Sequence, residues 1–327
     1  MRIFGLPRHK TQQILDGFAS ILTKERRKLS DKKHSSDYSC HSENMNENMT
    51  VQWFPGHMAK TRRLIKESLH LVDAVCEIVD ARIPESSRNP EIDEIVGSKP
   101  RIVLLNKCDL ADDNATARKI KELASKGITA LPVDCRNGKG LDKFQSAVRE
   151  VLKEKIRSNT EKGMAGKSLR VMVVGIPNTG KSSFINRMAG KNRAKVADKP
   201  GVTRSNQWFA IGSGIELLDT PGVLWPKFED PEVGFKLAFI GSVKDEILDS
   251  QEIAVRLLAV MQKNYPHRLA ERYKISDFEE LEPYELLELI GAKRGMLIKG
   301  GETDTERAAV MLLDEYRSGK LGKITLD

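Results

Sequence analysis

Residues 175–182, with the sequence GIPNTGKS, have the composition and spacing of a loop that binds phosphate groups. An apolar run precedes the loop, and a helix is expected to begin near Lys181. Backbone N–H groups of such a loop surround the phosphates, and the helix N-terminus adds its dipole. We expect Lys181 to reach the outer phosphates and the Ser182 hydroxyl to bind Mg²⁺. The expected phosphate-site residues are Asn178, Thr179, Gly180, Lys181, Ser182 and Ser183.

A second motif, Asn106, Lys107 and Asp109 in the sequence NKCD, ends another apolar run. Ligands of open α/β sheets bind at the carboxyl ends of the strands. The Asp109 carboxylate can accept two hydrogen bonds from the N1 and N2 edge of guanine, which adenine cannot offer. This motif therefore predicts selection of GTP over ATP. We expect Lys107 to pack over the base, with a backbone N–H near residues 133–135 facing guanine O6.

A third motif, DTPG at residues 219–222, is expected to complete the phosphate site. Asp219 would hold Mg²⁺ through water, and the Gly222 amide would sense the γ-phosphate. Thr203, in the sequence PGVT, lies between the other two motifs and would complete the Mg²⁺ coordination. The alternative for Thr203 is an ordinary solvated loop residue.

The order of these motifs along the chain is rotated. An ordinary GTPase has the phosphate loop first, then DxxG, then NKxD, whereas here NKCD comes first. The set is complete, so the order predicts a circularly permuted GTPase domain, with the switch region after Asp219 leading directly into whatever lies downstream.

The positions of apolar residues predict an α/β fold with a mostly parallel sheet, followed by a small α-helical domain. The expected strands are 74–79, 102–106, 128–133, 170–175, 208–211 and 215–219. The expected helices are 59–71, 115–126, 141–155, 235–239, 253–261, 278–290 and 306–316. Residues 157–167 have the composition of a polar connector between the two ends that an unpermuted domain leaves free.

Three parts of the chain are expected: a disordered extension at 1–48, the permuted GTPase domain at 49–230 and the helical domain at 231–327. The 327 residues carry a net charge of +8, and the sequence pI is about 9.2. This charge suits either a polyanionic partner or plain solubility. Residues 231–327 are acidic, with 14 Lys/Arg against 18 Asp/Glu. No apolar run approaches the ~20 residues of a membrane span, and no C-x-x-C pair suggests a zinc site.

The catalytic group is not contained in these three motifs. Ras-like enzymes orient the attacking water with a Gln just after DxxG, where this chain has Val223. We therefore expect slow intrinsic turnover and stimulation by a partner, which can add up to about 10⁵-fold. His57, in the sequence WFPGHM, is the candidate for positioning the water; the alternative is that it caps the following helix.

Asn178 has a second candidate role besides a place in the phosphate loop. An Asn there can offer an oxygen to K⁺ beside the β- and γ-phosphates, where the ion would act like an arginine finger. An Asn in a tight turn is the alternative, since Asn tolerates turn conformations well.

Together these motifs resemble the ribosome biogenesis GTPase A family of circularly permuted GTPases. The resemblance covers about residues 50–327 and rests on WFPGHMAK at 53–60, DARIP at 80–84, SSRNP at 86–90 and DTPGVLWP at 219–226, besides the motifs above. It implies GTP hydrolysis coupled to late maturation of the large ribosomal subunit, with His57 as the catalytic group, Asn178 linked to K⁺ dependence, and a helical domain that contacts rRNA.

The partners implied by the resemblance are a large-subunit intermediate, its rRNA and its ribosomal proteins, with no DNA. The acidic helical domain fits rRNA contact only through local clusters such as Lys293, Arg294 and Lys299. Arg82 and Arg88, on a loop at the nucleotide edge, either contact RNA or order that loop. We expect a cytoplasmic monomer, and organellar targeting by residues 1–48 is less favoured.

Three other functions stay open. Small-subunit assembly GTPases are also permuted but carry a cysteine-rich zinc module, which this sequence lacks. A signalling switch would bind effectors without RNA. A GTP-binding scaffold would bind the nucleotide without useful turnover, as Val223 allows.

Overall fold

The computed structural model describes residues 55–190, 207–212, 214–222, 230–243 and 249–327, with the side chains of residues 55–61 excepted. The chain divides into two units, Met1–Met49 and Thr50–Asp327, and every described residue belongs to the second. The extension expected at 1–48 therefore lies outside the described residues.

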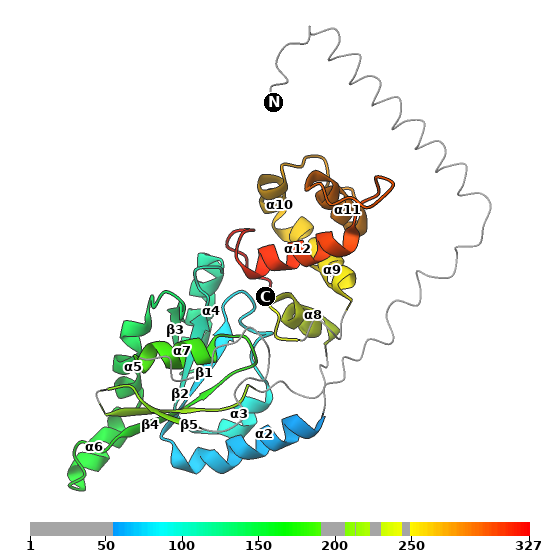
Figure 1. Cartoon of the computed structure of the whole chain (residues 1–327). Coiled ribbons are helices and arrows are strands. Elements are labelled where there is room, and N and C mark those ends of the chain that lie inside the picture. The colour runs from blue at the N-terminus through cyan, green and yellow to red at the C-terminus, as the bar shows by residue number, and fades with distance from the viewer. Residues whose placement is uncertain (1–54, 191–206, 213, 223–229, 244–248) are drawn as a thin grey trace. The chain divides into compact units, whose positions relative to one another are not determined.

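A six-stranded sheet forms the centre of the first half of this unit (Figure 1). Its strands are β1 (Ala74–Asp80), β2 (Arg101–Asn106), β3 (Thr129–Val133), β4 (Leu169–Val174), β5 (Gln207–Ala210) and β6 (Ile215–Asp219). The spatial order is β3-β2-β1-β4-β6-β5. All pairings are parallel except that of β5 with β6. The mostly parallel sheet that the sequence predicts is confirmed.

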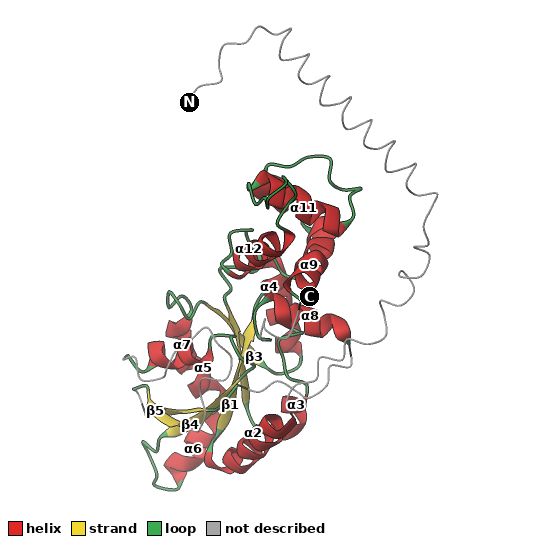
Figure 2. Cartoon of the chain, turned by 45° about the vertical axis from the view of Figure 1, so that its right-hand side comes forward, coloured by secondary structure: helices red, strands yellow, loops and turns green. Residues whose placement is uncertain are grey.

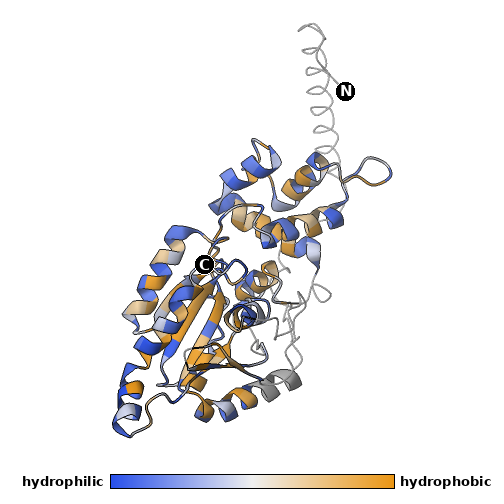
Figure 3. Ribbon diagram, turned by 60° about the vertical axis from the view of Figure 1, so that its left-hand side comes forward, coloured by the Kyte–Doolittle hydropathy of each residue, from blue (hydrophilic) through white to orange (hydrophobic). Residues whose placement is uncertain are grey.

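The central strands β1, β2, β4 and β6 are mostly apolar on both faces, which a sheet covered by helices on both sides requires. All seven residues of β1 are buried, and Figure 3 shows the strands as the most apolar part of this region. One face packs against α2 (Pro55–Ser68), α3 (Glu91–Val96) and α4 (Asp113–Ser125). The other packs against α5 (Phe144–Val151), α6 (Lys153–Glu161) and α7 (Lys181–Met188). Two short 3₁₀ turns are η1 (Leu69–Leu71) and η2 (Leu141–Lys143).

The helical part follows in the chain (Figure 2), and its buried apolar residues form one core cluster. Its helices are α8 (Pro231–Phe239), α9 (Ser250–Asn264), α10 (Pro266–Tyr273), α11 (Pro283–Lys293) and α12 (Thr305–Arg317). Aspartate side chains accept backbone N–H groups at the N-termini of α8, α9 and α12, the caps being Asp230, Asp249 and Asp304. Ile83 and Ile176, from the sheet side, lie in the same core cluster as these helices.

Several helix predictions are wrong in detail. Residues 157–167 are not simply a connector, because α6 runs to Glu161 and its amphipathic face packs through Ile156. The helix expected at 278–290 begins only at Pro283, since proline fits the first turn of a helix. For the same reason α2 begins at Pro55 and not near residue 59. The short helices α3 and α10 were not predicted.

Among the described helices, none combines the length and the apolar character needed to cross a membrane.

Candidate nucleotide site

The three sequence motifs meet at the carboxyl edge of the sheet. The phosphate loop leaves β4, which lies between β1 and β6. Asp219 ends β6, Asp80 ends β1 and Asn106 ends β2. Motifs that are rotated along the chain are therefore neighbours in space, as ligand sites in open α/β sheets require.

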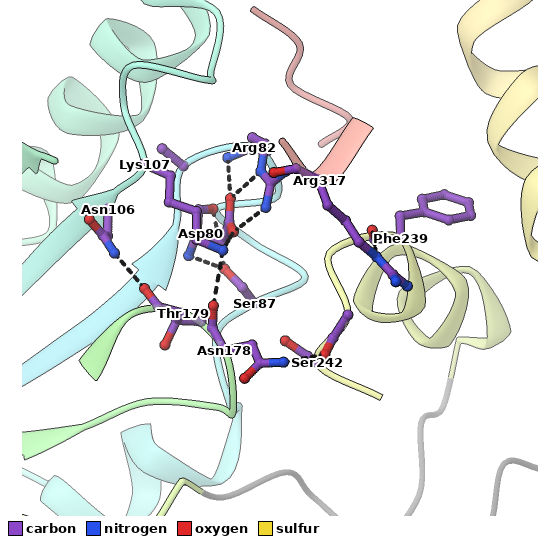
Figure 4. Close-up of polar contacts among 12 residues, drawn as sticks. Asp80, Arg82, Ser87, Asn106, Lys107, Asn178, Thr179, Phe239, Ser242 and Arg317 are labelled. Atoms are coloured by element: carbon purple, nitrogen blue, oxygen red, sulfur yellow. Dashed lines mark hydrogen bonds and ion pairs between the residues drawn. The ribbon is translucent and has the colours of Figure 1, made fainter. Parts of the chain in front are cut away.

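The phosphate loop and the base-reading motif touch directly at Gly180. A Cβ at this residue would lie 2.1 Å from Asn106 Nδ2, and its φ of +96° is one that side-chain-bearing residues rarely adopt. The Asn106 amide donates to the Thr179 carbonyl oxygen at 2.6 Å, and its Oδ1 accepts from Cys135 N–H at 2.9 Å. Asn106 thus ties the phosphate loop to the loop after β3, as Figure 4 shows in part.

Lys107 extends this connection. Its ammonium donates to the Asn178 carbonyl oxygen at 2.9 Å and lies 2.9 Å from Asp80 Oδ2. Its backbone has a φ of 60°, which turns the chain at the end of β2. The Lys107 side chain therefore crosses from the base-reading motif to the phosphate loop.

Lys181 and Asp219 form a buried ion pair where the phosphates and the metal are expected. Lys181 Nζ lies 2.5 Å from Asp219 Oδ1, and both side chains are buried. Burial lowers the pKa of Lys181, and the Asp219 charge acts against that shift. Ser182 and Ser183 are half-buried in the first turn of α7. The pair places a cation and an anion side by side, so Lys181 can contact a phosphate and Asp219 a metal ion at the same site.

The DTPG motif rests against the phosphate loop. A Cβ at Gly222 would lie 3.1 Å from Pro177 N, and the buried Thr220 hydroxyl donates to the Val173 carbonyl oxygen at 2.8 Å. Gly222 is thus placed beside the loop whose ligand it is expected to sense.

These residues fit a Mg²⁺ ion bound together with nucleotide phosphates. Mg²⁺ prefers hard oxygen ligands, keeps several waters and needs few protein ligands when phosphates supply the rest. The Asp219 carboxylate and the Ser182 hydroxyl are such oxygens, and both stand at the edge of the phosphate loop. Thr203, the third expected ligand, lies outside the described residues, as does Val223.

The expected base pocket is bordered by an exposed Asp109. In the facing loop, the Asp134 carboxylate accepts N–H groups of Arg136 at 2.8 Å and Asn137 at 3.0 Å. The Cys135 N–H, from the segment expected to meet guanine O6, donates to Asn106 instead. The exposed Asp109 side chain is accessible to a ligand, and the Asp134 carboxylate holds the facing loop.

The phosphate loop also contacts the helical part. Asn178 Nδ2 donates to the Gly241 carbonyl oxygen at 2.6 Å, and the Ser242 hydroxyl donates to the Pro177 carbonyl oxygen at 2.6 Å. Ile176 is buried in the helical core. Figure 4 shows Asn178 and Ser242 facing one another across this contact. A contact of this kind was not foreseen for Asn178, and it gives the side chain a role besides those considered from sequence.

Asp80 and Arg82 form a buried cluster beside the site. Arg82 Nη2 donates to Asp80 Oδ2 at 2.8 Å, and its Nε donates to Oδ1 at 2.9 Å. Burial would raise the pKa of Asp80, but Arg82 and then Lys107 outweigh it and hold that pKa well below its usual range. Of the two roles left open for Arg82, ordering of its loop is the one that this geometry supports.

Arg82 and Arg317 link the sheet to two helix ends. Arg82 Nη1 donates to the carbonyl oxygens of Tyr316 at 3.2 Å and Arg317 at 3.4 Å, at the end of α12. Arg317 in turn donates to the carbonyl oxygens of Ala238 at 2.9 Å and Phe239 at 3.1 Å, at the end of α8. Cations at helix C-termini are favoured by the helix dipole.

His57 and Arg88, two further residues that the sequence singles out, lie in a helix and in a loop. His57 lies in the first turn of α2, inside the helix and not before it, and its side chain is not among those the structure describes. Arg88 is mostly buried and pairs with Glu77 at 3.3 Å and Asp93 at 3.0 Å. Arg88 thus orders its own loop.

Sequence reasoning missed Gly241 and Ser242 as neighbours of the phosphate loop, since they lie more than sixty residues away. It also missed the contact of residues 319–327 with the base-reading loop. A turn signal at Gly319 and Gly322, followed by the apolar run ITL, was the available hint.

The fold and this arrangement of motifs define a P-loop GTPase with a circularly permuted motif order. A family model described as "50S ribosome-binding GTPase" matches residues 170–288, which begin in β4 and leave β1–β3 outside. Ribosome biogenesis GTPase A of Bacillus cereus is 49% identical over 279 residues, spanning 85% of this chain and 94% of that protein. The chain belongs to the ribosome biogenesis GTPase A family and hydrolyses GTP.

One more distant relative and one solved structure also match. Mitochondrial ribosome-associated GTPase 1 of Mus musculus is 33% identical, spanning 85% of this chain and 90% of that protein. A solved structure described as "GDP-bound structue of TM YlqF" is 30% identical with a TM-score of 0.58, and the match covers 81% of this chain and 98% of that one.

Proposed function

We propose that this chain binds immature large ribosomal subunits and couples GTP hydrolysis to a late step of their assembly. The names of its relatives and the description of the matched family model support a ribosomal partner. The observation that carries the coupling is the tie of the phosphate loop to the helical part through Asn178 and Ser242. A change at the γ-phosphate would thereby reach the helices.

The proposed GTP contacts follow from the positions of the motif residues. Asp109 would bind the guanine edge, while Lys181 would exchange part of its contact with Asp219 for phosphate oxygens. Because Lys181 is buried, its charge acts in a medium of lower dielectric constant than water, which strengthens the attraction. Ser182, Thr203 and Asp219 would hold Mg²⁺, which when bound neutralises charge on the phosphates.

Contact with rRNA is proposed for the helical part through Lys293 and Lys299, which are exposed. Arg294, the third member of that basic cluster, lies 3.2 Å from the Glu315 carboxylate, which Arg272 also contacts, so it already has a partner within the helical part. We propose a monomer in the cytoplasm as the active form.

Sedimentation tests the partner most directly. The protein is mixed with large-subunit assembly intermediates, mature large subunits or small subunits, in the presence of GDP or a non-hydrolysable GTP analogue. Co-sedimentation with the intermediates in the analogue only, and stimulation of phosphate release by the same particles, are expected. Binding that ignores the nucleotide, or no binding to large-subunit particles, would favour a switch for another partner or a scaffold.

His57 is proposed to position the attacking water, because Val223 cannot. Particle-stimulated turnover of His57→Ala should fall at least tenfold while GDP binding is unchanged. His70, exposed in η1, provides a matched control. If His57→Ala and His70→Ala change turnover equally, His57 does not position the attacking water.

Asn178 is proposed to support K⁺ beside the phosphates. Turnover is compared in K⁺ and Na⁺ for wild type, Asn178→Ala and Ser242→Ala. The two variants each remove one bond between the phosphate loop and the helical part, but only the first removes the proposed K⁺ ligand. If both variants turn over faster in K⁺ than in Na⁺, as wild type is expected to, Asn178 is not a K⁺ ligand and its role is the contact with Gly241.

A further inference from the structure

Residues 319–327, termed the strap, lie against the backbone that directly follows Asp109. Ile324 N–H donates to the Leu110 carbonyl oxygen at 3.0 Å. Asp112 N–H donates to the Thr325 hydroxyl at 3.0 Å, and that hydroxyl faces the Ala81 carbonyl oxygen at 3.4 Å. The strap therefore holds residues 110–112 by bonds to their backbone.

Side-chain contacts at the start and in the middle of the strap reinforce this arrangement. A Cβ at Gly319 would lie 2.5 Å from Leu110 Cδ2, and Gly319 has a φ of +78°, so glycine permits Leu110 to pack there. Lys323 Nζ lies 2.6 and 2.8 Å from the Asp113 carboxylate oxygens. The residue next to Asp109 is thus packed against the strap as well as hydrogen-bonded to it.

The strap is itself fixed to the helical part. The Tyr265 hydroxyl accepts from Thr325 N–H at 3.1 Å and donates to the Thr325 carbonyl oxygen at 2.7 Å. Leu321, Ile324 and Leu326 are buried in the helical core. The base-reading loop consequently rests on the same core that carries α9 and α12.

We propose that the strap is a positioning element for guanine recognition: it holds the Asp109 loop so that the carboxylate meets both guanine N–H donors at once. The inference rests on the proposed role of Asp109 in binding the base. A carboxylate that accepts two hydrogen bonds at once needs a fixed backbone, and the bonds at Leu110 and Asp112 supply it. The specificity of the site for guanine then depends on the helical part.

Comparison of GDP with IDP isolates this role, because hypoxanthine lacks the N2 amino group. The measured quantity is the ratio of the IDP and GDP dissociation constants, determined by calorimetry on the same preparation. Thr325→Val keeps the shape of the side chain but removes the hydroxyl that accepts from Asp112. We expect it to lower the ratio about two- to tenfold, the value of one net hydrogen bond.

Three further variants make the result decisive. Tyr265→Phe removes the hydroxyl that holds the strap and should lower the ratio in the same direction. Thr303→Val is the matched control, because the Thr303 hydroxyl bonds the Glu288 carbonyl oxygen within the helical part and does not touch the strap. Asp109→Ala should lower the ratio most.

The outcomes separate the two assignments. If Asp109→Ala lowers the ratio while Thr325→Val and Tyr265→Phe keep the wild-type value, the strap has no positioning role. If Asp109→Ala itself leaves the ratio unchanged, the base-site assignment fails and the strap inference fails with it. If the ratio falls in the Asp109, Thr325 and Tyr265 variants but not in Thr303→Val, both the base site and the positioning role of the strap are supported.

Discussion

Replacement of Arg82 by Met tests whether the buried charge cluster next to the site holds the structure together. Arg82 is almost fully buried, and its guanidinium bonds both Asp80 carboxylate oxygens and the last carbonyl groups of α12. It also lies over the Tyr316 ring, 5.1 Å from the ring centre. Methionine can fill similar space but supplies no charge.

The expected cost follows from what remains. Without Arg82, the buried Asp80 carboxylate keeps only the Lys107 ammonium of these two cations, at 2.9 Å. Removal of one partner from a buried ion pair costs about 3–5 kcal/mol of unfolding free energy. We expect Arg82→Met to fall in that range, since the lost carbonyl bonds add to the cost and Lys107 offsets part of it.

The double variant Asp80→Asn with Arg82→Met provides the sharper comparison. It leaves no uncompensated carboxylate, so it should be more stable than Arg82→Met alone although it carries one more substitution. The assay is urea unfolding followed by circular dichroism. Arg63→Met, which breaks an exposed pair with Glu67, should leave the midpoint unchanged. A destabilisation below about 1 kcal/mol for Arg82→Met, or purely additive effects in the double variant, would refute the reasoning.

Contacts within the sheet domain support three further predictions. Gly180→Ala should weaken GDP binding at least tenfold by calorimetry, because its Cβ would strike Asn106; wild-type affinity would contradict this contact. Burial raises the pKa of Asp80, but Arg82 and Lys107 lower it by more, so the folded pKa is below the unfolded value of about 4. Ionised Asp80 therefore stabilises the fold above about pH 4. That contribution is lost as the pH falls toward the folded pKa. The difference in unfolding free energy between wild type and Asp80→Asn, measured by urea unfolding, should therefore shrink below about pH 4. A difference that grows there would contradict a lowered folded pKa. Burial raises the pKa of Cys135 to about 12, so in a Cys40→Ser background a disulfide reagent at pH 8 should label the native protein slowly; rapid labelling would place a thiol at the surface. The thiols concerned are buried: Cys76, Cys108 and Cys135.

The central strands β1, β2, β4 and β6 were predictable because they are covered on both faces. Each is an apolar run bounded by polar residues, and the predictions at 170–175 and 215–219 agree with β4 and β6 to within one residue. The short helices α3 and α10 gave no such signal. With six and eight residues, they are shorter than the window of about 11–18 residues in which a helical repeat of apolar residues is recognised.

The sequence predicts the motif residues of the site, but not the groups that hold them. The sequence predicts that NKCD and GIPNTGKS face one ligand, and the structure places Asn106 against Gly180. The acceptors for Arg82 and Asn178 are backbone carbonyl groups. Every residue has a backbone carbonyl group, so the sequence does not indicate which one is the acceptor; only the folded chain does. The strap was missed for the same reason, since Thr325 bonds a backbone N–H more than two hundred residues away.

The central claim is that the phosphate loop and Asp109 bind opposite ends of one GTP molecule, and Asp109→Asn tests it most directly. An amide in place of the carboxylate offers a donor to the C2 carbonyl of xanthine and loses one acceptor for guanine. The affinities of GDP and XDP are measured by calorimetry for wild type and Asp109→Asn, with Lys181→Ala as the phosphate-end control. We predict that the variant prefers XDP where wild type prefers GDP, a reversal of at least about 100-fold, and that Lys181→Ala weakens both nucleotides alike. An Asp109→Asn protein that binds GDP as tightly as wild type and gains nothing for XDP would contradict this claim.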